Sequence, residues 1–150
     1  MRKAFTMIEL IFVIVILGIL AAVAIPKLAA TRNDATTAKL AQNIMTGASE
    51  IAAYAMSQAQ IDSNFSVMSN AMQTMSQSGA AVLSSNRAVI QSGSVSDCVE
   101  VAVDSNATTG VDTLNISFGD PSGDSQCLAI QNAIDANEYP MKLRGKNVTY

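Results

Sequence analysis

The sequence contains no histidine and no tryptophan, and aromatic residues make up only 5% of it. Histidine is the most frequent general base and the usual partner of a nucleophilic serine or cysteine. Its absence therefore excludes histidine-based catalytic triads and histidine-ligated metal sites. The sequence has no glycine-rich phosphate-binding loop either. These absences predict that the protein is not an enzyme.

Charged residues are also scarce, at 14%, and their balance is acidic. The formal net charge is −3, and without Arg2 and Lys3 the remaining seven basic and twelve acidic side chains give −5. An acidic chain is a poor general binder of nucleic acid, which attracts clustered Lys and Arg. With 150 residues and few aromatics, the chain has room for one small domain with a modest core.

One long apolar stretch, residues 5–25, stands out from the rest of the chain. Glu9 is the single charged side chain in its 21 residues. As a helix the stretch would be roughly 31 Å long, enough to cross the hydrocarbon core of a bilayer. Arg2 and Lys3 precede it. The positive-inside rule then leaves the N-terminus in the cytoplasm and carries the rest of the chain across.

Two interpretations of this stretch compete. It is either a secretory signal peptide, cut after Ala22-Val23-Ala24, or a segment that the mature protein keeps. Apolar residues continue beyond it at steps of three and four, at Leu40, Ile44, Ala48, Ile51 and Ala55. This spacing predicts one helix from about residue 5 to residue 60, kinked near Pro26 and amphipathic in its second half. The continuing helix favours retention.

The residues that open the stretch form a specific motif. Ala4-Phe5-Thr6-Met7-Ile8-Glu9-Leu10, with Pro26 closing the apolar run, resembles the prepilin-type N-terminus of type IV pilins and type II secretion pseudopilins. The resemblance covers the leader and the apolar run closely, and the rest of the chain only in its general plan. Ala4 stands where the family usually has glycine.

The resemblance implies a processing route and a place in the cell. Residues 1–4 would be a leader that a prepilin peptidase removes between Ala4 and Phe5, and Phe5 would then be N-methylated. Glu9 would pair with the N-terminal amine of a neighbouring subunit. The protein would span the bacterial inner membrane once, with its C-terminal domain in the periplasm. An inner-membrane assembly platform would then add it to an extracytoplasmic filament with other copies and related pilins or pseudopilins.

The polar part of the chain predicts a small α+β head domain, residues 61–150. Strict alternation of apolar and polar residues is typical of half-buried antiparallel strands. The strand candidates are residues 87–91, 97–104, 112–118 and 141–150, and the helix candidates are 66–77 and 126–136. The predicted fold class is α+β, with a pilin-like long helix, apolar over 5–25 and amphipathic over 26–60, packed on a small antiparallel sheet.

A stripe of three methionines lies in the first of these short helices, at Met68, Met72 and Met75. Thioether sulfur can bind copper or line a partner groove, but no histidine accompanies the stripe. We interpret it as core filling.

Cys98 and Cys127 lie in the polar part, after a membrane-targeting segment. We expect them outside the cytoplasm and joined in a disulfide, worth about 3–4 kcal/mol in the chain-entropy model. The alternative is two reduced, buried cysteines.

Asp120 and Asp124 flank a Pro-Ser-Gly turn and are weak calcium candidates, since Ca²⁺ takes carboxylate and carbonyl oxygens. The resemblance adds that major pseudopilins bind calcium in a C-terminal loop. A solvated turn without a cofactor is the favoured interpretation.

Two further surface patterns occur near the end of the chain. Lys142, Arg144 and Lys146 fall at every second position, so they share one face of a strand. We favour a solvated face. Contact with the acidic surface of a neighbouring subunit is the second interpretation, and DNA binding is the last. The segment Asp104-Ser105-Asn106-Ala107-Thr108 matches the acidic form of a bacterial N-glycosylation site.

Together these patterns predict a structural subunit of a type II secretion pseudopilus or a type IV pilus. It would act in protein secretion, or in adhesion, motility or DNA uptake. The alternative is a secreted or membrane-anchored binding domain that does not polymerise.

Overall fold

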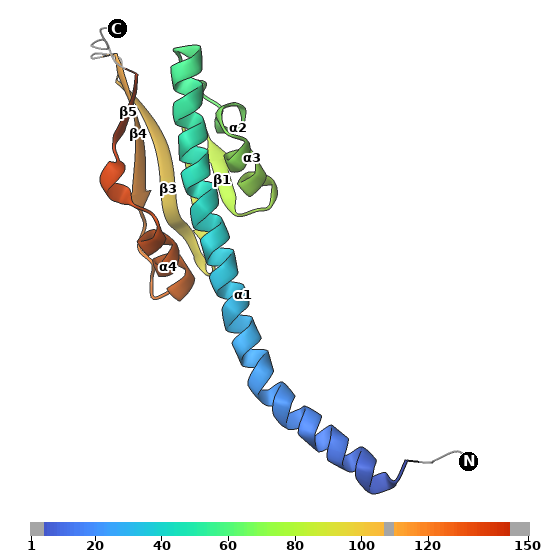
Figure 1. The fold of residues 1–150 in the computed structure, drawn as a ribbon. Helices are drawn as coiled ribbons and strands as arrows, with labels where there is room; N and C mark the ends of the chain where they lie inside the picture. Colours follow the sequence, from blue (N-terminus) through green and yellow to red (C-terminus); the bar gives the residue numbers. More distant parts are fainter. Residues whose placement is uncertain (1–4, 107–109, 145–150) are drawn as a thin grey trace. The chain divides into compact units, whose positions relative to one another are not determined.

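The structure is a computed structural model that describes residues 5–106 and 110–144 (Figure 1). It contains four α-helices, one 3-10 turn and five strands in these ranges. They are α1 (Met7–Gln58), α2 (Phe65–Met68), α3 (Asn70–Gln77), β1 (Ala81–Ser84), β2 (Arg87–Ser92), β3 (Val95–Asn106), β4 (Val111–Phe118), α4 (Ser125–Ala133), η1 (Ala136–Glu138) and β5 (Met141–Arg144). The chain divides into two compact units between Thr36 and Thr37, and each is described by itself.

The first unit consists of the N-terminal part of α1. By length and composition, α1 is able to cross a membrane, because an 18-residue window has a mean hydropathy of 3.1 and none of it is buried. Helix α1 continues through Pro26, which cannot donate the backbone hydrogen bond expected at that position. The kink near Pro26 stays a prediction.

The second unit is the head, in which α1 packs on an antiparallel sheet (Figure 1). The strands follow one another in the order β1-β2-β3-β4-β5, so each pairs with its neighbour in sequence. Short connections join β1 to β2 and β2 to β3, as antiparallel neighbours allow, whereas α4 and η1 lie between β4 and β5. The predicted α+β arrangement of a long N-terminal helix on a small antiparallel sheet is confirmed.

The predicted alternation places one face of each central strand in the core. Cross-strand pairs Val101–Ile116 and Val103–Leu114 join β3 to β4, and all four side chains are buried. The same core contains the predicted face of α1, at Ile44, Ala48, Ile51 and Ala55. The opposite face of the sheet carries polar groups, including the Arg87–Glu100 ion pair at 2.9 Å.

The stretch 66–77 differs from its prediction as one short helix, because Ser69 divides it into α2 and α3. The Ser69 backbone is extended, and its hydroxyl accepts the Met72 N–H at 3.0 Å as the N-cap of α3. Its hydroxyl also donates to Glu50 Oε2 at 2.7 Å, and the Ala71 N–H donates to the same oxygen at 2.9 Å. Glu50 of α1 therefore fixes where α3 begins.

The methionine stripe faces the core. Met68, Met72 and Met75 are each buried, which agrees with core filling. A Cβ built on Gly47 of α1 would lie 2.6 Å from Met72 Cε and 3.0 Å from Met72 Cγ. Glycine at position 47 therefore allows α3 to approach α1 closely.

Candidate functional site

The first candidate site is the start of α1, where Thr6 and Glu9 cap the helix reciprocally. Glu9 Oε2 accepts the Thr6 backbone N–H at 2.8 Å and the Thr6 hydroxyl at 2.6 Å. The Thr6 hydroxyl oxygen in turn accepts the Glu9 N–H at 3.4 Å. This is a capping box, which satisfies N–H groups that have no partner inside the helix. The sequence contained its signal, Thr-x-x-Glu ahead of an apolar run, but our sequence analysis did not use it.

The cap engages only half of the Glu9 carboxylate. Both bonds to the side chain use Oε2 and leave Oε1 outside the cap. Phe5, immediately before Thr6, is 83% exposed. The large apolar side chains that follow it in α1, up to Leu28, are exposed as well. Ala4, the other side of the expected cleavage point, lies outside the described residues. Cleavage there would convert the Phe5 N–H into a cationic amine within one helical turn of Glu9.

In a comparison with known protein families, residues 1–25 match a family model described as "Prokaryotic N-terminal methylation motif". The N-terminus is of the prepilin type. This motif is the hallmark of the leaders of type IV pilins and pseudopilins, which are structural subunits. The motif and the apolar N-terminal part of α1 both agree with anchoring in the inner membrane. Comparison with curated proteins and with solved structures finds no significant match.

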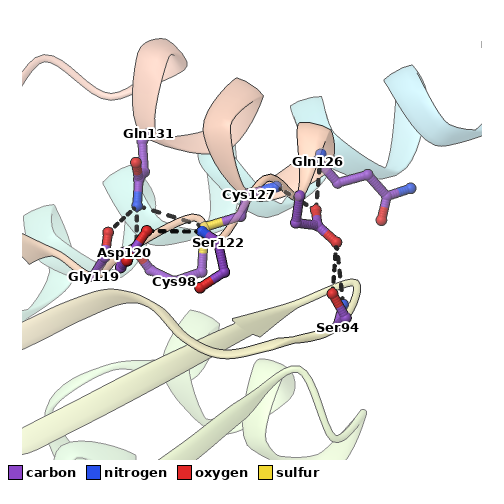
Figure 2. Close-up of a disulfide and its surroundings, with 9 residues drawn as sticks. Ser94, Cys98, Gly119, Asp120, Ser122, Gln126, Cys127 and Gln131 are labelled. Atoms are coloured by element: carbon purple, nitrogen blue, oxygen red, sulfur yellow. Dashed lines mark hydrogen bonds between the residues drawn. A yellow bond between two sulfur atoms is a disulfide. The ribbon is translucent and has the colours of Figure 1, made fainter.

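The second candidate site lies in the head, around the disulfide between Cys98 of β3 and Cys127 of α4 (Figure 2). The expected pairing is present, with a Cα–Cα distance of 5.6 Å, and both cysteines are fully buried. The Gln131 side-chain amide donates to the carbonyls of Cys98 and Gly119, each at 2.9 Å. A Cβ on Gly119 would overlap the Asp97 carbonyl, so glycine is required at that close approach. Helix α4 is thus fixed to the sheet covalently and by hydrogen bonds.

Asp124 is the N-cap of α4. Its Oδ1 accepts the backbone N–H groups of Gln126 and Cys127 at 2.9 Å each. Its Oδ2 accepts the backbone N–H and the hydroxyl of Ser94 at 3.2 Å each. These donors, led by the Cys127 N–H and then the Ser94 N–H, lower the pKa of Asp124 from its ordinary value, against a smaller opposing effect of burial.

Asp120 bonds within its own turn, where its Oδ1 accepts the Ser122 N–H at 2.8 Å. In the described ranges, no three His, Cys, Asp or Glu side chains lie close enough together to hold a metal ion. Calcium binding by Asp120 and Asp124 stays a prediction.

A cleft of about 330 Å³ lies beside this turn, lined by Ser94, Val95, Ser96, Asp97, Asp120 and Ser122. Both aspartates are exposed. Neither takes part in an ion pair with another described residue. We call this feature the acidic cleft. Sequence reasoning singled out Asp120 with Asp124 and did not bring Asp97 and Asp120 together.

Two other surface predictions are only partly covered. Lys142 is exposed on β5, paired in register with Thr113 of β4. The Arg144 side chain and Lys146 lie outside what the structure describes. Asn106 is exposed at the end of β3, whereas Ala107 and Thr108 of the expected glycosylation segment also lie outside the described residues.

Proposed function

We propose that this protein is a filament subunit, a structural component of a type II secretion pseudopilus or a type IV pilus. A prepilin peptidase cleaves it between Ala4 and Phe5, and Phe5 is N-methylated. The protein waits in the inner membrane with its head in the periplasm. An inner-membrane assembly platform then packs its apolar helix beside those of other copies and related subunits.

The observation that carries this proposal is the continuity of α1 beyond a prepilin-type N-terminus. One helix extends from Met7 to Gln58, and its last turns supply buried residues to the core of the head. Cutting after Ala24, as for a signal peptide, would remove the first 18 residues of that helix. Cutting after Ala4 preserves it whole. The structure therefore supports the site at Ala4, because this site leaves α1 whole.

Glu9 supplies the proposed assembly contact. A lone charged carboxylate near the centre of a bilayer costs a few kcal/mol or more, so residues of this kind usually have a partner. Thr6 occupies Oε2 and leaves Oε1 available for the N-terminal amine of the next subunit. Methylation preserves the positive charge of that amine. The pairing would fix the axial register of adjacent apolar helices.

The proposal is tested by the mass of the mature N-terminus. We expect the N-terminal peptide of the membrane-extracted protein to begin at Phe5 and to carry one additional methyl group. A parallel preparation from cells that lack prepilin peptidase should begin at Met1. A chain that begins at Ile25 in peptidase-containing cells, or one that keeps Met1 there, would contradict the proposal and support an anchored or secreted binding domain.

A further inference from the structure

The loop that joins α1 to α2, residues 59–64, forms one side of an open pocket in the head (Figure 1). The pocket has a volume of about 320 Å³, and its lining consists of Tyr54 of α1 and Gln60, Ile61, Asp62 and Ser63 of the loop. All five residues belong to the unit that begins at Thr37. The volume falls within the range of small-molecule sites, about 300–1,000 Å³. We call this feature the Tyr54 pocket.

Contacts with the core and with a neighbouring turn fix the loop of the pocket. Ile61 packs against the core of the head. The Asn86 backbone N–H, in the turn between β1 and β2, donates to the Ser63 carbonyl at 3.2 Å. Asp62 Oδ1 accepts the Asn64 N–H at 2.8 Å. The wall of the pocket is therefore formed before a ligand arrives, which reduces the entropy lost on binding.

Several polar groups of the pocket are available to a ligand. In the part of the chain that the structure describes, the Tyr54 hydroxyl, the Gln60 amide and the Ser63 hydroxyl form no hydrogen bond with another residue. Asp62 uses Oδ1 within the loop and leaves Oδ2 outside that bond. The pocket thus offers two hydroxyls, an amide and one carboxylate oxygen, which include both donors and acceptors.

The composition of the lining narrows the class of ligand. An anion would meet the Asp62 carboxylate, and the lining contains no Lys or Arg to compensate it. An apolar ligand would leave the polar side chains without partners, which is unfavourable. A cation has donors only, so it would leave the N–H groups of Gln60 without an acceptor. A neutral ligand with several hydroxyls both donates and accepts, and it satisfies all of these groups.

We propose that the Tyr54 pocket binds a neutral sugar ring, a hexopyranose of the kind found in cell-wall and surface polysaccharides. The C–H groups of one face of the sugar pack on the aromatic ring of Tyr54, and its hydroxyls bond to Gln60, Asp62 and Ser63. This inference goes beyond the proposed filament function, because the pocket lies in the head and the binding needs no second subunit.

A nuclear magnetic resonance titration of the full-length chain tests the proposal. The ¹⁵N-labelled protein is kept in a phosphocholine detergent, because the headgroup of a glycoside detergent is itself a sugar. The probes are glucose, galactose, mannose and N-acetylglucosamine. At least one should shift the Gln60 side-chain and Ser63 backbone signals saturably, with a Kd in the millimolar range that a few hydrogen bonds provide. It should also give nuclear Overhauser effects between sugar C–H protons and the Tyr54 ring. The proposal is overturned if none of the four gives a saturable shift up to about 100 mM.

Gln60→Ala/Ser63→Ala tests whether the polar groups of the pocket hold the sugar. Both side chains are exposed, so the melting temperature should stay close to that of wild type. The affinity for the sugar should fall about tenfold, the loss expected for two hydrogen bonds. Gln73→Ala makes the same glutamine change on the exposed side of α3, outside the pocket, and should bind like wild type. Equal affinities of the double variant and wild type would mean that the sugar binds elsewhere.

Charged probes separate the sugar from other ligands. The uronic acid that corresponds to the bound hexose should bind more weakly than the hexose, because Asp62 repels its carboxylate. Asp62→Asn keeps an oxygen for the Asn64 N–H and should remove this difference. If 1,5-diaminopentane binds saturably and no sugar does, the pocket is a cation site and the proposal is wrong.

Polymer fragments identify the source of the sugar. Tighter binding of muropeptides than of neutral polysaccharide fragments would support a cell-wall ligand, and the reverse order would support a surface polysaccharide. Failure of every sugar leaves the filament proposal intact, because the mass of the mature N-terminus tests that proposal separately.

Discussion

Glu9 combines two tasks that substitution can separate. Its Oε2 caps α1 through Thr6, and its charge is proposed to pair with the amine of a neighbouring subunit. Glu9→Gln keeps an oxygen for the cap and removes the charge. We expect Glu9→Gln to insert in the membrane with unchanged helicity by circular dichroism, but to lower filament yield about tenfold or more.

Thr6→Val provides the control for the Glu9 experiment. It removes the hydroxyl that bonds the carboxylate but preserves the charge of Glu9. Filament yield should remain within about twofold to threefold of wild type, because losing an N-cap costs about 1 kcal/mol and only the first turn is affected. A severe assembly defect in Thr6→Val with a normal yield from Glu9→Gln would assign Glu9 to helix capping alone.

Asp124 gives the head a pH-dependent contribution to stability. Its folded-state pKa is lowered by the backbone N–H groups of Cys127 and Ser94, so the ionised form stabilises the fold at pH values above the unfolded-state pKa of about 4. This stabilisation is lost as the pH falls through the lowered pKa. We expect Asp124→Asn to reduce the melting temperature at pH 7, and the difference from wild type to shrink as the pH is lowered below 4.

Asp104→Asn is the matched control for Asp124→Asn. Asp104 is an exposed aspartate near the end of β3, so this variant removes the same charge without removing a helix cap. Its melting temperature at pH 7 should stay close to that of wild type. Equal effects of the two substitutions would mean that net charge, rather than the α4 cap, accounts for the change.

At the scale of elements, the packing of α3 on α1 depends on Gly47. Glycine to alanine inside a helix normally stabilises by about 1 kcal/mol. Here the new Cβ would overlap the fully buried Met72, and overpacking of a core costs about 1–3 kcal/mol. We therefore expect Gly47→Ala to lower the free energy of unfolding by about 1 kcal/mol, measured by denaturant titration of the detergent-solubilised chain.

The Met72→Ala background tests whether the overlap is the cause. Met72→Ala is itself destabilising, by about 2–5 kcal/mol, because it leaves a cavity. With that space open, adding Gly47→Ala should raise the free energy of unfolding by about 1 kcal/mol instead of lowering it. Additive effects of the two substitutions would exclude the proposed contact.

At the scale of the whole molecule, the two units meet different physical demands. The unit before Thr37 exposes a continuous apolar surface, which only a bilayer or other apolar helices can cover. The head instead encloses a small core of aliphatic residues, methionines and Phe65, and a disulfide joins β3 to α4. Under the proposed function, the apolar helix would exchange the bilayer for the apolar helices of neighbouring subunits, and the head would stay in water in both places.

Much of this protein was predictable from its sequence because the signals are local. The apolar span 5–25 and the continuation of α1 at steps of three and four are local patterns. So are the alternation in β3 and β4 and the Asp124 cap. Each depends on residues within a few positions of one another. The prepilin-type motif is contiguous as well, and it matches residues 1–25. With two cysteines in the chain, a disulfide had one possible pairing.

Tertiary structure alone decided which distant residues meet. Asp97 and Asp120 come to one cleft because the Gly119 N–H bonds the Cys98 carbonyl, where β4 ends beside β3. Glu50 meets Ser69, and Gly47 meets Met72, because the core fixes α3 against α1. Such contacts follow from strand register and side-chain packing, which many residues determine jointly and no short stretch encodes. Local sequence thus specified the elements and the N-terminal motif, while packing of the head brought distant residues such as Asp97 and Asp120 together.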